Sequence, residues 1–74
     1  MIHLFFLQQG ISFTGSDIGG SYETNWQTCG RLCQASGTCG YWTFKESSKY
    51  CYLKSSGSGL EYWSGRISGK KGCS

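Results

Sequence analysis

The cysteines are the feature that most limits what this chain can fold into. Five of them lie within 74 residues: Cys29, Cys33, Cys39, Cys51 and Cys73. A chain this short buries only about 60% of the surface that it exposes when unfolded, so its core alone gives marginal stability. Cysteine-rich domains of this size are typical of oxidising compartments, where disulfide bonds supply the missing stability. We therefore expect a small secreted domain held together by disulfides.

The spacing of the cysteines argues against a metal site. The chain contains no C-x-x-C pair, and its single histidine, His3, lies far from the cysteines in sequence. Zinc sites typically combine two closely spaced pairs of ligands. We expect no metal and no cofactor. The odd number of cysteines leaves one thiol that is free, bonded to another chain, or bonded to a partner outside this sequence.

Charge and hydropathy exclude two further classes of protein. The net charge is +3, and the basic residues are scattered singly apart from Lys70 and Lys71, which we expect in a solvated tail. Nucleic-acid-binding domains typically carry a denser basic stripe, so we expect no nucleic-acid partner. The longest apolar run, residues 4–7, is far shorter than the roughly 20 residues of a membrane-spanning helix. We expect no transmembrane segment.

The N-terminal residues indicate a strand rather than a signal peptide. They contain neither a basic leading region nor a small-x-small cleavage site. Residues 2–14 are rich in β-branched and aromatic types, and apolar and polar residues alternate over 11–14, as in a half-buried strand. Gly10 is a candidate break. We expect an N-terminal apolar strand or arm over 1–11 and one domain over 12–74.

One helix is predicted over residues 26–36. Its apolar residues recur at helical spacing, namely Trp26, Cys29, Leu32, Cys33 and Ala35. Thr24 or Asn25 can serve as the N-cap, and Gly37 is placed to end the helix in a left-handed conformation. The glycines at 15, 19 and 20, around Asp17 and Ile18, predict a turn before it.

Strands are predicted after the helix. Residues 39–45 and 49–54 form a hairpin joined by Glu46, Ser47 and Ser48, and residues 60–68 form the last strand. The alternation puts Trp42 and Phe44 on one face and groups Cys51 with Leu53. The order strand, helix and three strands predicts an α+β domain with an antiparallel sheet packed on one helix.

Five cysteines allow 15 arrangements of two disulfides, and sequence alone does not choose among them. Cys29 and Cys33 lie at i and i+4 on one helix face, so each can reach a different neighbour. Geometry favours Cys33 with Cys39, closing a short loop, and Cys29 with Cys51, closing a longer one. The chain-entropy relation gives these bonds about 2.4 and about 3.4 kcal/mol respectively.

The combination of cysteine spacing and strand sequences resembles the PAN/apple family over about residues 12–73. The matching segments are Phe13-Thr-Gly-Ser-Asp-Ile-Gly, Cys29-Gly-Arg-Leu-Cys, Cys39-Gly-Tyr-Trp-Thr-Phe, Cys51-Tyr-Leu-Lys-Ser and Ser68-Gly-Lys-Lys-Gly-Cys. The resemblance implies a curled antiparallel sheet cradling one helix, with the two disulfides above as the core pair. Apple domains add a third bridge between the chain ends. Cys73 stands at its later position, but Ile2 and His3 stand where the early cysteine falls.

The resemblance also implies a non-catalytic extracellular module that binds proteins or carbohydrates. The residues agree, because the lone His3 has no nucleophile near it in sequence, and we expect no enzyme activity. Among the twelve aromatic residues, periodicity places Trp26, Trp42 and Phe44 in the core. Tyrosines are frequent in binding surfaces, so the predicted ligand contacts are Tyr41, Tyr50, Tyr52 and Tyr62, with Lys45, Glu46 and Lys49 at the hairpin; Tyr22 is a further surface candidate.

A second hypothesis makes the chain a self-assembling subunit of an extracellular fibre. The apolar N-terminal segment, the unpaired Cys73 and the lightly charged surface motivate it. In this reading a strand formed by Ile2, Leu4, Phe5, Phe6 and Leu7 adds to the sheet edge of a neighbouring copy. The competing reading pairs that strand inside its own domain, since exposed apolar strands are usually protected.

Overall fold

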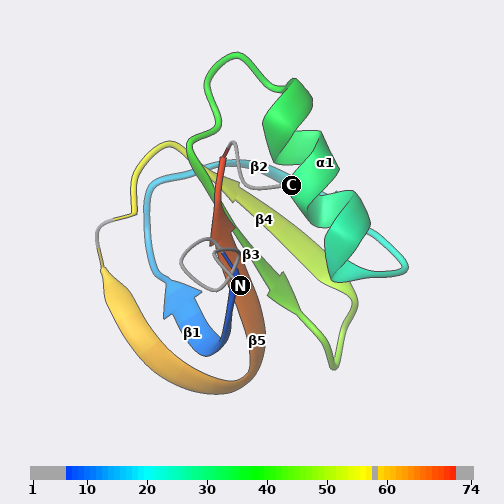
Figure 1. Ribbon diagram of the computed structural model, residues 1–74, viewed down its shortest axis with the longest axis vertical. Coiled ribbons are helices and arrows are strands. Elements are labelled where there is room, and N and C mark those ends of the chain that lie inside the picture. The colour runs from blue at the N-terminus through cyan, green and yellow to red at the C-terminus, as the bar shows by residue number, and fades with distance from the viewer. Residues whose placement is uncertain (1–6, 58, 72–74) are drawn as a thin grey trace.

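A computed structural model describes residues 7–57 and 59–71 of the chain (Figure 1). The elements in chain order are β1 (Leu7–Phe13), β2 (Asp17–Tyr22), α1 (Trp26–Ala35), β3 (Tyr41–Lys45), β4 (Tyr50–Lys54) and β5 (Leu60–Lys70). The hairpin of β3 and β4 and the last strand are confirmed. The α+β class, with one helix on an antiparallel sheet, is confirmed as well.

The predicted turn around Asp17 and Ile18 is wrong, because this segment forms β2 instead. One of its glycines, Gly20, allows close approach to the neighbouring strand. A methyl group added at Gly20 would lie 2.7 Å from the Cys51 carbonyl oxygen and equally close to the Tyr50 ring. Glycine inside a strand often marks such an approach. Glycine is also common in turns, so the sequence alone predicts a turn at this segment.

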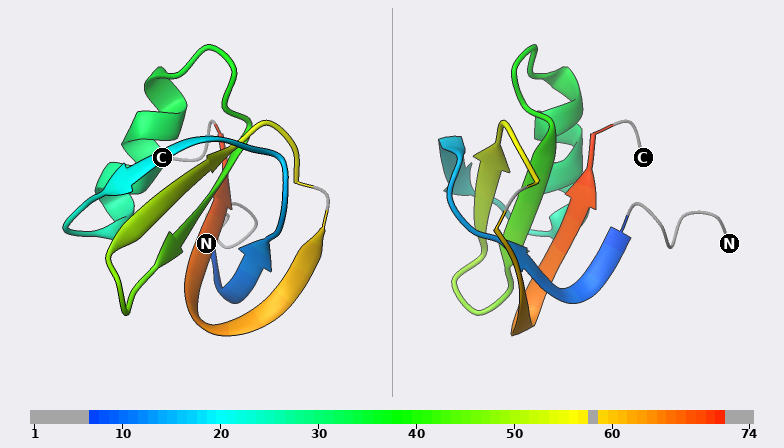
Figure 2. Two further views of the ribbon diagram at one scale, coloured as in Figure 1. Left: turned by 180° about the vertical axis from the view of Figure 1, so that it is seen from behind. Right: turned by 90° about the vertical axis from the view of Figure 1, so that its left-hand side faces the viewer.

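The five strands form one antiparallel sheet in the order β1-β5-β3-β4-β2. Trp42 lies opposite Leu53, and Phe44 lies opposite Cys51, so the apolar residues of β3 and β4 share one face. Helix α1 packs against that face, as Figure 1 and Figure 2 show. The other face is partly enclosed by the two outer strands on the β1 side.

The sheet face opposite α1 is enclosed because both β1 and β5 bend. Gly10 and Gly65 have φ values of 76° and 82°, a region that glycine enters without steric cost. The β1 to β5 register shifts between Gln9 and Ile11, so that Gln9 pairs with Ile67 but Ile11 with Tyr62. Figure 2 shows β5 curving round to follow β1. The bend carries the residues after β1 over the face opposite α1.

The helix begins as predicted but ends differently. Asn25 is the N-cap, and its Oδ1 accepts a 2.8 Å hydrogen bond from the Thr28 N–H. At the other end Ser36 is extended, and its N–H donates to the Cys33 and Leu32 carbonyl oxygens, both at 3.1 Å. Ser36 therefore closes the helix with backbone bonds, and Gly37 does not take the predicted left-handed conformation.

The core lies between α1 and the sheet. Its buried members are Cys29, Cys33, Cys39, Trp42, Phe44, Cys51 and Ile67. Disulfides join Cys29 to Cys51 and Cys33 to Cys39, the pairing that the spacing favours. Trp26 is partly buried and stacks on Trp42 at a centroid distance of 6.1 Å. The predicted core aromatics are thus confirmed, and covalent bonds tie the helix to β4 and to the segment before β3.

Lys71 is not in a solvated tail. Its N–H donates to the Gly40 carbonyl oxygen at 2.8 Å, and its Nζ donates to the Ser36 carbonyl oxygen at the end of α1. Leu7 pairs with Gly69 of β5, so this end of the predicted assembly strand pairs inside its own sheet. The rest of that strand, Ile2, Leu4, Phe5 and Phe6, and also Cys73, lie outside the described residues. No helix in the described part of the chain is both long and apolar enough to cross a membrane.

Candidate functional site

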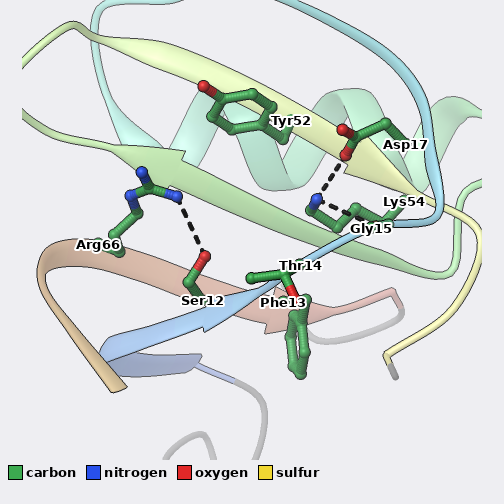
Figure 3. Close-up of a pocket in the computed structure, with 8 residues that line it drawn as sticks. All are labelled: Ser12, Phe13, Thr14, Gly15, Asp17, Tyr52, Lys54 and Arg66. Carbon is green, nitrogen blue, oxygen red and sulfur yellow. Dashed lines mark hydrogen bonds and ion pairs between the residues drawn. The ribbon is translucent and has the colours of Figure 1, made fainter. Parts of the chain in front are cut away.

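A pocket of about 190 Å³ lies on the sheet face opposite α1. Its walls come from the end of β1, the loop that follows it, the start of β2, and residues of β4 and β5 (Figure 3). The lining residues are Ser12, Phe13, Thr14, Gly15, Asp17, Tyr52, Lys54 and Arg66. This volume is below the roughly 300–1,000 Å³ of pockets for drug-sized ligands, so it suits a single sugar ring or a single side chain.

Lys54 supplies a buried cation on one side of this pocket. Its side chain is 4% exposed, and its Nζ donates to the Gly15 carbonyl oxygen at 3.2 Å and to the Asp17 carboxylate. The Tyr52 ring centroid is 5.4 Å from the same nitrogen. A buried charge is tolerated only with such partners. Asp17 is 55% exposed, so its carboxylate reaches the solvent at the pocket rim.

Arg66 supplies a second cation on the opposite side (Figure 3). Its guanidinium lies 4.4 Å from the Trp63 ring centroid and 5.9 Å from that of Tyr52. One of its nitrogens donates to the Ser12 Oγ at 3.1 Å. Guanidinium groups are attracted to aromatic faces, so the two rings and the hydroxyl fix the position of this side chain.

A buried hydroxyl network holds β1 against the sheet beneath the pocket. The Phe13 N–H donates to the Thr43 Oγ1 at 3.1 Å, and that oxygen shares a 2.8 Å hydrogen bond with the Ser68 Oγ. Ser12, Thr43 and Ser68 are at most 1% exposed. Ser12 is buried because the curled β1 and the Arg66 side chain enclose it.

A row of tyrosine rings leads from the pocket to the edge of the sheet. Tyr52 and Tyr50 have ring centroids 4.8 Å apart, and Tyr50 and Tyr22 are separated by the same distance. Tyr22, on the edge strand β2, is 74% exposed. Aromatic rings in such a row offer flat apolar faces next to the polar groups of the pocket.

The predicted contact residues divide into two groups. Tyr52 lines the pocket, and Tyr50 contacts Tyr52. The remaining predicted residues do not line it: Tyr41 packs edge to face on Phe13, Tyr62 is 84% exposed on β5, and Lys45, Glu46 and Lys49 lie at the hairpin of β3 and β4.

Sequence reasoning missed most of the polar lining. Lys54 follows Tyr52 by two residues in a predicted strand, so the period of two places both on one face and could have identified Lys54. Asp17 and Ser12 could not be found in this way, because their partners Lys54 and Arg66 lie 37 and 54 residues further along the chain.

This arrangement offers both hydrogen-bond donors and acceptors to a ligand. Its donors are an ammonium and a guanidinium, and its acceptors are a carboxylate, hydroxyls and a carbonyl oxygen. Over residues 7–57 and 59–71, His, Cys, Asp and Glu side chains nowhere form a group of three that could hold a metal ion.

Solved structures of two parasite proteins are similar to this chain. A solution structure of the two N-terminal apple domains of Toxoplasma gondii microneme protein 4 matches with a TM-score of 0.78 and 24% identity, over 89% of this chain and 44% of that chain. The chain thus spans less than half of that two-domain structure. A PAN module from Eimeria tenella matches with a TM-score of 0.68 and 30% identity, over 93% and 81% of the two chains. Among curated proteins none matches.

A family model described as PAN domain matches residues 5–74. PAN and apple modules are generally non-catalytic, are typically extracellular, and bind proteins or carbohydrates in adhesion. The family model covers most of the chain, and the helix, the antiparallel sheet and the two disulfides match the folds of both solved structures. The chain belongs to the PAN domain family.

Proposed function

We propose that this chain is an extracellular, non-catalytic module that binds carbohydrate, with one sugar ring seated in the pocket beside Tyr52. The observation that carries the proposal is the composition of the pocket wall. Donors on Lys54 and Arg66, acceptors on Asp17 and an aromatic ring converge on a space of about 190 Å³. Sugars present hydroxyls that need both donors and acceptors, and ring faces that pack on aromatic side chains.

The shape of the site favours a sugar over a folded protein surface. Protein interfaces of standard size bury about 800 Å² on each partner. This pocket is a hollow of about 190 Å³ lined by eight residues, so it matches a small group better than a broad surface. The tyrosine row that continues to Tyr22 supports contact with a second sugar ring. The predicted secretion of the chain agrees with a ligand on a cell surface or in its coat.

A glycan array tests the proposal directly. The oxidised chain should bind a defined subset of glycans, and Tyr52→Ala should reduce binding by about tenfold or more, as expected for loss of a central aromatic contact. Tyr62→Ala is the matched control, because Tyr62 is 84% exposed and lies outside the pocket lining. An array without binding, or binding lost in Tyr62→Ala and kept in Tyr52→Ala, would overturn this site, and a protein ligand would then be sought.

A further inference from the structure

Arg66 is the one charged group of the pocket whose charge has no opposite partner. All four acidic residues of the chain lie in its described part, and the single ion pair there joins Asp17 to Lys54. None of the four brings a carboxylate oxygen within 4 Å of the Arg66 guanidinium. Glu61, on the same strand, instead accepts a 2.7 Å hydrogen bond from the Trp63 indole nitrogen.

The guanidinium is nevertheless held in place. The Trp63 and Tyr52 rings and the Ser12 hydroxyl contact it, and Arg66 itself is half-buried. A guanidinium carries five N–H donors in a planar fork, and the described contacts use one of them. A side chain fixed before the ligand arrives loses little further entropy on binding. Its remaining donors are therefore ready for an acceptor.

Charge decides which acceptor fits best. Two cations and one carboxylate line the pocket, and the carboxylate already faces Lys54. Figure 3 shows Arg66 and the Asp17 to Lys54 pair on opposite sides. An anionic group would be repelled near Asp17 and attracted near Arg66, where partial burial reduces screening by salt. Hydrogen bonds between a guanidinium and an anionic oxygen are about twice as strong as neutral ones.

We propose that Arg66 makes this pocket selective for acidic sugars, whose carboxylate or sulfate group it binds. This inference rests on the proposed carbohydrate-binding function and adds the class of ligand. In the resulting pose the acidic group lies against Arg66, the ring packs on Tyr52, and neutral hydroxyls face Lys54 and Asp17. Lys54 stays with its own carboxylate, so the selectivity comes from Arg66.

The test compares matched sugars that differ in one group. The probes are the methyl glycosides of glucuronic acid and glucose, those of galacturonic acid and galactose, and galactose 6-sulfate, each titrated into the oxidised chain by NMR. We expect at least one acidic probe to bind about tenfold more tightly than its neutral counterpart, the gain that one charge-assisted contact supplies. The uronate and sulfate arms distinguish the two anionic groups.

Two arginine variants with the same substitution complete the design. Arg66→Gln should abolish the preference for the acidic probe, whereas Arg31→Gln removes the same charge from the exposed side of α1 and should keep both the preference and the affinity. Arg66→Lys keeps the charge without the planar fork and should keep part of the preference. The NMR spectra of the Arg66→Gln and Arg66→Lys variants should show that both are folded, so that a lost preference is not caused by unfolding.

Each other outcome is decisive. Equal affinity for acidic and neutral sugars, or a preference that survives in Arg66→Gln, would overturn the role of Arg66 while leaving carbohydrate binding in place. A preference lost equally in Arg31→Gln would attribute it to net charge and overturn the inference. Binding of none of these probes, together with an empty glycan array, would overturn both the inference and the proposed function.

Discussion

The two faces of this sheet differ in chemistry although the same strands build them. Toward α1, Trp42, Phe44 and Cys51 are apolar and at most 5% exposed. Toward the pocket, Thr43, Tyr52 and Lys54 from the same two strands meet hydroxyls, charges and solvent. The alternation of a strand thus lets one hairpin contribute both the core and the candidate site. Stability and binding are therefore expected to respond to different, interleaved residues.

The largest effect is expected from a pair of aromatic residues on opposite faces. Phe44→Ala removes a ring that is 2% exposed and should lower the free energy of unfolding by about 3–5 kcal/mol. Tyr52→Ala, on the neighbouring strand and half-buried, should lower it by about 1 kcal/mol. Urea unfolding followed by tryptophan fluorescence measures both. Equal losses would show that the pocket face is part of the core after all.

The two disulfides come next, because both belong to the apolar face. Replacing Cys29 and Cys51 together by serine should cost about 3.4 kcal/mol, and replacing Cys33 and Cys39 about 2.4 kcal/mol, because the first bond closes the longer loop. Thermal unfolding of the two double variants gives the ranking. The reverse order would indicate that local tethering of the helix end outweighs loop entropy.

The smallest changes in the free energy of unfolding are expected at the pocket ion pair, and they should differ between its two members. Asp17→Asn leaves the buried Lys54 ammonium without its counter-charge and should cost about 1–3 kcal/mol. Lys54→Met removes the buried charge itself and fills a similar volume, so it should cost less than about 1 kcal/mol. Chemical unfolding of both variants is the measurement. A larger loss in Lys54→Met would mean that the charge on this face supports the fold as well as the site.

Sequence reasoning recovered the apolar face far better than the polar one. Trp42, Phe44 and the cysteines obey local rules, namely a period of two in strands and i to i+4 spacing in the helix, so their neighbours could be inferred from short stretches. Ser12 on β1 and Arg66 on β5 meet because both strands bend, at Gly10 and Gly65. Gly10 marks a candidate break in the first strand, but a glycine alone does not say which residues the bend brings together.

Two wrong predictions, the turn in β2 and the helix end at Gly37, also arise from contacts that the sequence does not show. The glycines of β2 predict a turn, but Gly20 is needed for the approach of Cys51 and Tyr50 across the sheet. Gly37 predicts the helix end, but Ser36 already supplies the required hydrogen bonds. In both places the sequence shows a glycine, but not the contact across the sheet or the backbone hydrogen bonds that decide the local structure.

The pairing of Leu7 with Gly69 determines how the fold responds to a pulling force. The two ends of the described chain leave neighbouring antiparallel strands at the same end, so tension between them peels β1 from β5 one hydrogen bond after another. Ser12 and Arg66, which lie on these two strands, separate in the process, while the disulfide between Cys29 and Cys51, 22 positions apart in sequence, keeps the helix tied to β4. Under load the pocket is therefore expected to open before the core is lost.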